Sequence, residues 1–134
     1  MWAPGDASGA LLEREDEMMR VLVADDQSHV RSALRLLLAQ EPGITVVSEA
    51  ADVEQALRMA AEQCPDLVLL DWELPGQNST TLLHALRAVQ PGSRVIALSG
   101  RPEARQAALD AGADGFVSKG DPPERLLAAV GECR

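Results

Sequence analysis

The sequence predicts an α/β domain built on a parallel β-sheet, and three observations support this. Five short apolar runs, of the kind that form strands, alternate with five segments in which apolar residues recur every three or four positions, as on one face of a helix. The strand runs are continuously apolar, which is typical of strands covered on both faces. Pro-Gly pairs and single glycines separate several of the segments. This alternation predicts parallel strands joined by right-handed helical crossovers.

The five predicted strands are short and rich in Val, Leu and Ile. The second carries the most β-branched residues, and the third has four apolar residues in a row before a carboxylate, Asp71. In chain order the strands are predicted at 21–24, 44–50, 66–70, 94–99 and 115–118.

Each predicted strand is followed by an apolar helical stripe. Three stripes are closed by a glycine or a Pro-Gly pair, and two prolines suit the first turn of the last helix. The stripes are Val30, Ala33, Leu34, Leu37 and Leu38; Val53, Ala56, Leu57, Ala60 and Ala61; Leu82, Leu83, Leu86 and Val89; Ala104, Ala107, Ala108 and Ala111; and Leu126, Leu127 and Val130.

The composition indicates one domain behind a short extension. The chain has 134 residues, 46% of them apolar, which suits a single core. Residues 1–18 are rich in Gly, Pro, Ser and acids and predict a flexible N-terminal extension, with the folded domain at 19–134. The extension is acidic where a secretory signal is basic, and no apolar run approaches the roughly 20 residues of a membrane span. We therefore expect a cytoplasmic protein without membrane contact, with Cys64 and Cys133 as free thiols.

The charge balance is acidic, with 12 Lys and Arg against 21 Asp and Glu and a formal net charge of -9. Direct nucleic-acid binding needs basic patches that displace counterions, so we expect none by this chain. No Walker loop and no GxGxxG follows the first strand, which disfavours nucleotide binding. His29 and His84 are predicted on helix surfaces, and no Ser-His-Asp arrangement is indicated.

Polar and charged residues stand where four of the predicted strands end. Asp25 and Asp26 follow the first strand, Asp71 the third and Lys119 the fifth, and Ser99 ends the fourth. Each alone has an ordinary explanation, such as a solvated turn, a helix cap or a surface lysine. Together they belong to the carboxyl edge of the sheet, where ligands bind in such folds. Close carboxylates need a cation between them, and hard oxygen ligands favour Mg²⁺. A hydroxyl and an ammonium beside the metal suit a phosphoryl group.

From residue 20 to residue 130 the sequence resembles the receiver domains of response regulators, in particular those of the NarL/FixJ type. The resemblance rests on the pair Asp25-Asp26, on Asp71 between LVLL and WELPG, on Ser99 after RVIAL, and on Lys119 at the end of AGADGFVSK. It implies the flavodoxin-like (βα)5 fold, with a five-stranded parallel sheet of strand order 2-1-3-4-5.

The resemblance also implies roles in phosphorylation and switching. Asp71 would be the phosphoacceptor, Lys119 would pair with the phosphoryl oxygens, and Ser99 would move to hydrogen-bond the phosphoryl group. Phe116 would be the switch aromatic that turns inward as the hydroxyl moves. The output surface would comprise the helix with the 104–111 stripe, the strand after it and the last helix.

For the metal, the resemblance implies Mg²⁺ held directly by Asp26, Asp71 and the backbone carbonyl of Glu73, with Asp25 acting through a water. Two flanking residues, Glu73 and Arg101, stand where such domains tune the lifetime of the phosphoryl group. An ion pair between Arg101 and Glu73 over the pocket is a further hypothesis, against the simpler expectation of two solvated side chains.

The function implied is a phosphoryl-accepting signalling switch and not a metabolic enzyme, with only weak self-phosphorylation and autodephosphorylation. The donor would be the phosphohistidine of a sensor histidine kinase, and the output a partner protein or domain, for example a helix-turn-helix transcription factor domain. A homodimer through the last two helices is compatible with the resemblance. Two alternatives remain open. One is a pseudo-receiver that binds without phosphorylation. The other is a small Mg²⁺-dependent phosphatase, which would have Asp where Glu73 stands.

Overall fold

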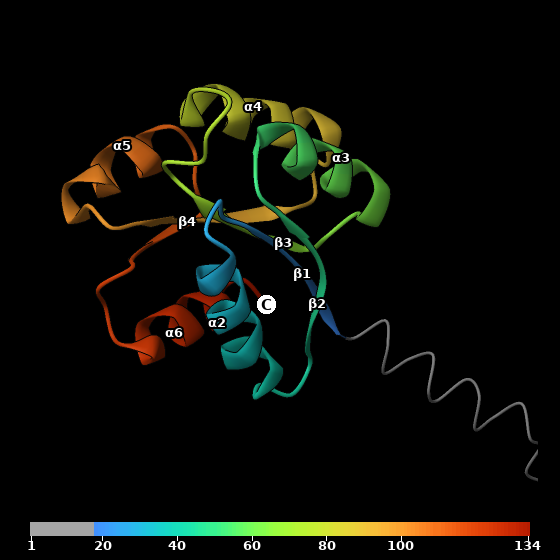
Figure 1. The fold of residues 1–134 in the computed structure, drawn as a ribbon, viewed down its shortest axis with the longest axis vertical. Helices are drawn as coiled ribbons and strands as arrows, with labels where there is room; N and C mark the ends of the chain where they lie inside the picture. Colours follow the sequence, from blue (N-terminus) through green and yellow to red (C-terminus); the bar gives the residue numbers. More distant parts are fainter. Residues whose placement is uncertain (1–17) are drawn as a thin grey trace, which may run out of the picture.

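The computed structural model describes residues 18–134 and confirms the predicted parallel sheet (Figure 1). Its strands follow the order β2-β1-β3-β4-β5, so the flavodoxin-like topology 2-1-3-4-5 is confirmed. The expected extension at 1–18 lies outside the described residues except for Met18. The strands are β1 (Met19–Ala24), β2 (Ile44–Ala50), β3 (Leu67–Asp71), β4 (Arg94–Ser99) and β5 (Gly115–Ser118).

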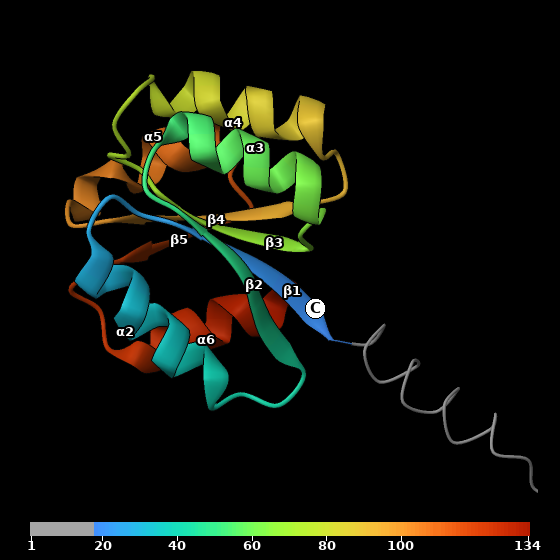
Figure 2. The ribbon, with the colours of Figure 1, turned by 45° about the vertical axis from the view of Figure 1, so that its right-hand side comes forward.

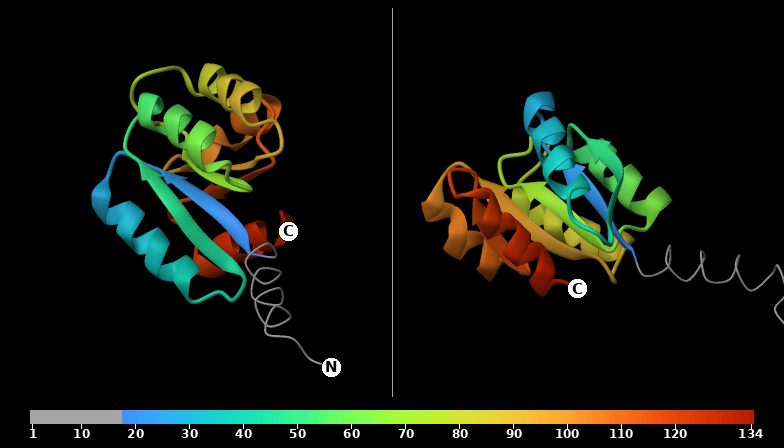
Figure 3. Two further views of the ribbon diagram at one scale, coloured as in Figure 1. Left: turned by 90° about the vertical axis from the view of Figure 1, so that its right-hand side faces the viewer. Right: turned by 90° about the horizontal axis from the view of Figure 1, so that it is seen from below.

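Helices cover both faces of the sheet. The helices are α2 (Ser28–Ala39), α3 (Val53–Gln63), α4 (Ser79–Val89), the short 3-10 helix η1 (Pro102–Ala104), α5 (Arg105–Asp110) and α6 (Pro123–Glu132). Helices α3, α4 and α5 lie on one face, and α2 and α6 lie on the other (Figures 1 and 2). The left view of Figure 3 shows the same three layers from the side. No helix within residues 18–134 is long and apolar enough to cross a membrane.

Strand β3 explains why four apolar residues follow one another without alternation. Val68 and Leu70 belong to the core layer under α3, α4 and α5, whereas Leu67 and Leu69 belong to the layer under α2 and α6. All four side chains are fully buried. Burial of each such side chain is worth about 1.5–3 kcal/mol, so this central strand is a rigid support for the residue at its end, Asp71.

The structure adjusts three predicted boundaries. Strand β1 begins at Met19, two residues earlier than predicted, because Met19 pairs with Ile44 of β2. Strand β3 includes Asp71, which pairs with Leu98 of β4, so the carboxylate is itself part of the sheet. The predicted helix over the alanine stripe at 104–111 is divided, since its first turn is the 3-10 helix η1, which begins with a proline.

The loop after β3 approaches α3 so closely that it requires a glycine. The backbone N–H of Val53 donates to the carbonyl of Pro75 at 3.3 Å. Gly76 next to it has φ +119°, and a Cβ built there would lie 3.1 Å from Cβ of Val53. Both the positive φ and the contact exclude a larger residue without local strain.

Replacing Gly76 by alanine is therefore expected to lower the free energy of unfolding by about 1–3 kcal/mol. Gly92 is the matched control, because its φ is ordinary and a Cβ there meets no atom within 4 Å. Its replacement by alanine is expected to change stability by about 0.5 kcal/mol or less. Urea denaturation followed by circular dichroism measures both. Equal losses for the two variants would contradict the argument.

Candidate functional site

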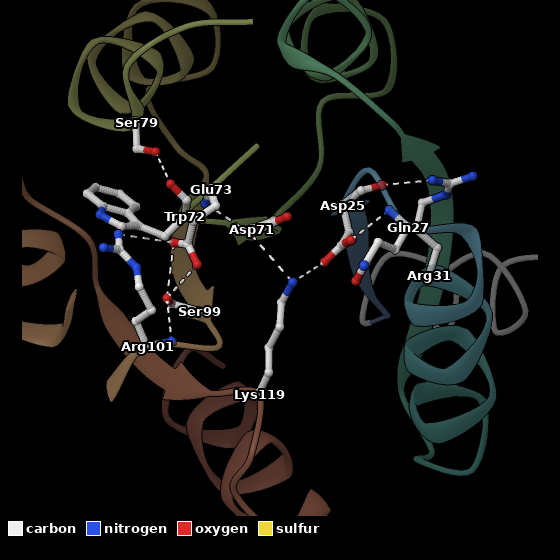
Figure 4. A network of polar contacts seen from close by, with 10 residues as sticks. All are labelled: Asp25, Gln27, Arg31, Asp71, Trp72, Glu73, Ser79, Ser99, Arg101 and Lys119. Carbon is white, nitrogen blue, oxygen red and sulfur yellow. Dashed lines mark hydrogen bonds and ion pairs between the residues drawn. The ribbon is translucent and has the colours of Figure 1, made fainter. Parts of the chain in front are cut away.

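Side chains from the ends of four strands meet at the carboxyl edge of the sheet (Figure 4). Strands β1 and β3 pair side by side up to the residues before Asp25 and Asp71, which makes these two carboxylates neighbours. The backbone N–H of Lys119 donates to the carbonyl of Ser99 at 2.8 Å, which ties the end of β5 to the end of β4. Asp25 and Ser99 are fully buried, and Asp71 is 3% exposed. We call this cluster of Asp25, Asp26, Asp71, Ser99 and Lys119 the pocket. Two of its carboxylates, those of Asp25 and Asp71, are almost fully buried.

Lys119 lies between these two carboxylates. Its Nζ donates to Oδ2 of Asp25 at 2.7 Å and lies 3.5 Å from Oδ1 of Asp71. Burial by itself lowers the pKa of Lys119, but the hydrogen bond to Asp25 and the charge of Asp71 outweigh it and raise that pKa. Lys119 is therefore a permanent cation at neutral pH, and it balances part of the negative charge of the pocket.

The pocket disfavours the charged form of the Asp71 carboxyl. Burial raises its pKa, the N–H of Glu73 lowers it, the charge of Asp25 raises it, and Lys119 lowers it, with a net increase. The N–H of Glu73 donates to Oδ1 of Asp71 at 3.0 Å. The negative charge around the Asp71 carboxylate therefore exceeds the positive charge that Lys119 supplies.

A divalent cation would balance this excess of negative charge. One oxygen from each of Asp25, Asp26 and Asp71 lies within 4.8 Å of the other two, with Asp26 exposed and the others buried. Oxygen ligands of an octahedral ion at about 2.0–2.1 Å lie roughly 3–4 Å apart, so small side-chain movements would close the site. The exposed Asp26 gives an ion access from solvent. Hard, anionic oxygens of this kind suit Mg²⁺.

The Ser99 hydroxyl contacts Glu73, a partner that the sequence did not predict. It donates to the carboxylate of Glu73, at 2.8 Å from Oε1 and 3.0 Å from Oε2, and it accepts from the N–H of Arg101 at 3.0 Å (Figure 4). Nη2 of Arg101 lies 4.0 Å from Oε2 of Glu73, at the outer limit of an ion pair, and both side chains are more than a third exposed. Such a pair contributes at most about 1 kcal/mol.

Ser79 contacts the loop that follows Asp71, and Phe116 lies in one core layer of the domain. The hydroxyl of Ser79, at the start of α4, donates to the carbonyl of Trp72 and so closes the loop between β3 and α4. Phe116 of β5 is 9% exposed and packs in the core layer of α3, α4 and α5. The aromatic ring is thus already buried while Ser99 is bonded to Glu73.

The chain matches the family model of the response regulator receiver domain over residues 21–131. It is 37% identical over 116 residues to the nitrate/nitrite response regulator protein NarL of Escherichia coli K12, which covers 85% of this chain and 54% of that protein. It is 35% identical over 123 residues to a protein-glutamate methylesterase/protein-glutamine glutaminase of Rhodopseudomonas palustris, covering 88% of this chain and 34% of that one.

Solved structures show the same likeness. A two-component response regulator of the LuxR family from Aurantimonas sp. SI85-9A1 superimposes with a TM-score of 0.79 at 32% identity, covering 86% of this chain and 84% of that one. The response regulator domain of Thermotoga maritima CheB gives a TM-score of 0.77 at 28% identity, covering 87% and 96%. The chain spans about half the length of NarL, so the similarity concerns one domain of that protein.

Proposed function

The chain belongs to the response regulator receiver domain family, and we propose that it is a phosphoryl-accepting signalling switch in which Asp71 is the phosphorylated residue. The observation that carries the proposal is the setting of Asp71. This carboxylate is almost fully buried at the end of the central strand, with the Lys119 ammonium 3.5 Å from one oxygen. Asp25 and Asp26 supply further oxygens beside it. The pocket therefore offers a nucleophile, an ammonium that can hold phosphoryl oxygens, and carboxylates that can hold a cation.

In the proposed reaction, an oxygen of the Asp71 carboxylate attacks the phosphorus of a phosphohistidine. The new O–P bond forms as the P–N bond breaks, and the imidazole leaves with the electron pair of that bond and takes up a proton. The N–H of Glu73 and the ammonium of Lys119 keep Asp71 ionised and oriented for this attack. Negative charge then grows on the phosphoryl oxygens. The Lys119 ammonium exchanges part of its contact with the carboxylates for contact with these oxygens.

The proposed cofactor is Mg²⁺. Asp26, Asp71 and the backbone carbonyl of Glu73 would hold it directly, and Asp25 would act through a water. When bound, the ion supplies positive charge to the phosphoryl oxygens. The cluster of Asp25, Asp26 and Asp71 supports this assignment, because its three oxygens lie within 4.8 Å of one another.

The proposed partners are a sensor histidine kinase as donor and an output protein or domain as recipient of the signal, in the cytoplasm. A helix-turn-helix domain is the proposed output, since the Aurantimonas relative is a response regulator of the LuxR family. The signal would leave through α5, β5 and α6, and a homodimer would use α5 and α6. The Rhodopseudomonas relative is a methylesterase, so one kind of receiver accompanies more than one output.

Incubation of the full chain with acetyl phosphate and Mg²⁺ tests the proposal. Intact-mass measurement is expected to show one added phosphoryl group, and peptide mass mapping to place it on Asp71. Chelation of Mg²⁺ is expected to prevent the addition. Absence of any adduct would overturn the proposal and favour a pseudo-receiver, and sustained turnover of unrelated phosphoesters would instead favour a phosphatase.

A further inference from the structure

The peptide group that joins Asp25 to Asp26 is held by a side chain of the next helix. Nη1 of Arg31 donates to the backbone carbonyl of Asp25 at 2.7 Å, and Figure 4 shows the guanidinium turned towards this carbonyl. The N–H of Asp25 donates to the carbonyl of Ala50 at 2.9 Å, where the pairing of β1 with β2 ends. No backbone N–H within residues 18–134 bonds to the carbonyl of Asp25. Arg31 therefore contacts the one peptide group that separates the two carboxylates of this loop.

The direction of the Arg31 side chain follows from its place in the helix. Arg31 is the fourth residue of α2, and side chains on a helix tilt towards its amino end. An arginine one turn into the helix is thus directed back to the loop that precedes it. The N-cap residue, Gln27, makes no side-chain cap hydrogen bond, and the first turn of α2 has no acidic residue. Arg31 therefore joins α2 to the loop 25–27 in place of the usual capping contacts.

The guanidinium of Arg31 is itself held by the sheet. Its Nε donates to Oε1 of Glu49 at 3.2 Å, and the other carboxylate oxygen of Glu49 contacts Nη2 of Arg35. Glu49 belongs to β2 and pairs with Val23 of β1, so its backbone is fixed. The side chain of Arg31 is 19% exposed and that of Arg35 is 58% exposed. The planar fork of Arg31 can contact a carboxylate and a carbonyl at once, which a lysine ammonium does with less directionality.

The two carboxylates of the loop differ in how firmly they are held. The Asp25 side chain is fully buried, and it accepts from Nζ of Lys119 at 2.7 Å and from the N–H of Gln27 at 2.9 Å. Asp26 is exposed, so packing does not fix its side chain. Its place depends on the backbone of the loop, where Arg31 bonds the preceding carbonyl. A ligand that is already ordered binds a metal more tightly than one that must be ordered on binding.

We propose that Arg31 is a positioning residue for the metal site, which orients the peptide group between Asp25 and Asp26 and so places the Asp26 carboxylate to hold Mg²⁺ beside Asp71. The inference rests on the proposed function, because it takes Mg²⁺ as the cofactor. It predicts an effect opposite to that of charge alone. Arg31 is a cation at the base of a cluster of three carboxylates, so by Coulomb's law its removal would strengthen Mg²⁺ binding. Loss of positioning would weaken Mg²⁺ binding instead.

Titration of the metal-free protein with Mg²⁺ tests the proposal, and the fluorescence of Trp72 serves as the readout. Trp72 is 8% exposed and directly follows Asp71. The chain has one other tryptophan, Trp2, which every protein in the series replaces by phenylalanine. The series comprises this reference, R31M, R31K, R35M and V130A. R35M removes the other arginine that contacts Glu49, and V130A removes a buried side chain two turns into α6.

We expect R31M to raise the dissociation constant of Mg²⁺ about tenfold, the lower end of the usual effect of losing a group that orients a metal ligand. R31K keeps the charge and a donor but not the planar fork, and its constant is expected to lie between those of the reference and R31M. R35M is expected to change the constant by about twofold or less, since its ion pair is exposed. V130A is expected to lower the urea midpoint and to leave the constant unchanged.

Amide hydrogen exchange in EDTA supplies a readout without metal. The N–H of Gln27 donates to Oδ1 of Asp25, so its exchange rate reports the order of the loop. We expect faster exchange at Gln27 in R31M than in the reference, and no change at this amide in R35M.

Unchanged or tighter Mg²⁺ binding by R31M would overturn the proposal, and so would unchanged exchange at Gln27. Equal weakening by R31M and V130A would also overturn it, because general loss of stability would then explain the effect. Where R31M does not fold, R31K decides: Mg²⁺ binding as tight as that of the reference would contradict the proposal. If the reference protein neither binds Mg²⁺ nor accepts phosphate from acetyl phosphate, the proposed function fails and this inference with it. If it does both, and R31M binds Mg²⁺ as tightly, the inference alone fails.

Discussion

Replacing Asp71 by asparagine is expected to abolish the phosphoryl adduct and, in metal-free buffer, to raise the free energy of unfolding by about 1–2 kcal/mol. The adduct is lost because the amide is no longer a nucleophile. Stability rises because the charge of Asp71 is buried beside Asp25. One oxygen of Asp71 lies within 4.8 Å of one oxygen of Asp25. Two charges about 4 Å apart interact by about 4 kcal/mol at an effective dielectric constant of 20, and Lys119 offsets only part of this repulsion.

The stability gained by Asp71→Asn should decrease as the pH falls. Burial, followed by the charge of Asp25, raises the pKa of Asp71 above its ordinary value of 3.8 despite the N–H of Glu73 and the charge of Lys119. The folded protein therefore binds this proton more tightly than the unfolded chain does. Such a group destabilises the fold at pH values above its folded pKa, and the penalty disappears as the pH falls to the ordinary value. The advantage of Asp71→Asn should accordingly shrink as the pH falls from 7 towards 4.

Urea unfolding of the wild type and Asp71→Asn in EDTA, at several pH values, measures this difference. The exposed Glu62, replaced by glutamine, removes a charge far from the pocket and is expected to leave stability within about 0.5 kcal/mol. An Asp71→Asn variant that is less stable than the wild type, or a gap that does not change with pH, would contradict the electrostatic explanation. A phosphoryl adduct that survives the substitution would contradict the assignment of Asp71.

The fold, and the residues that come together in the pocket, could be predicted from the sequence because both depend on topology. Parallel strands bring their carboxyl ends to one edge, so residues that follow strands, such as Asp25, Asp71 and Lys119, come together wherever the crossovers place their strands. The strand order itself followed from the family resemblance and not from the apolar pattern. The apolar run before Asp71 was a reliable signal for the same reason, since both faces of a central parallel strand are covered.

The contact of Ser99 with Glu73 was not accessible in this way. It joins residues 26 positions apart through the rotamers of two side chains, and no periodicity encodes a rotamer. The only signal was the place of Glu73, two residues after Asp71, where the chain turns back over the pocket. The closer approach of Lys119 to Asp25 than to Asp71, 2.7 against 3.5 Å, is likewise a matter of side-chain geometry.

The position of the Phe116 ring is a further feature that the sequence does not determine. The resemblance led us to expect an aromatic ring that turns inward together with the movement of Ser99. In the structure the ring is 9% exposed while the hydroxyl is bonded to Glu73. Ring position depends on how the core layer of α3, α4 and α5 packs around β5, which residue identity alone does not determine.

Replacing Lys119 by methionine is expected to lower the free energy of unfolding by about 3 kcal/mol and to slow phosphorylation by about 10- to 100-fold. The stability loss follows from Asp25, whose buried carboxylate would keep its charge without its 2.7 Å partner. Removal of one partner of a buried pair costs about 3–5 kcal/mol, and Lys119, at 26% exposed, belongs at the lower end. The rate loss follows from a missing charge-assisted contact to the phosphoryl oxygens, worth about 1.5–3 kcal/mol.

The double variant Asp25→Asn/Lys119→Met separates these two effects. Asparagine removes the buried charge that methionine leaves unpaired, so the double variant should recover most of the stability lost by Lys119→Met, as measured by urea unfolding. It should be phosphorylated more slowly than Asp25→Asn alone, measured by intact mass over time with acetyl phosphate, because both variants lack the Asp25 carboxylate near the proposed Mg²⁺ but only the double variant lacks the ammonium. Lys119 is the only lysine in the sequence, so no neighbouring lysine can substitute for it. Recovery of the rate together with stability would mean that Lys119 acts only by holding Asp25 in place.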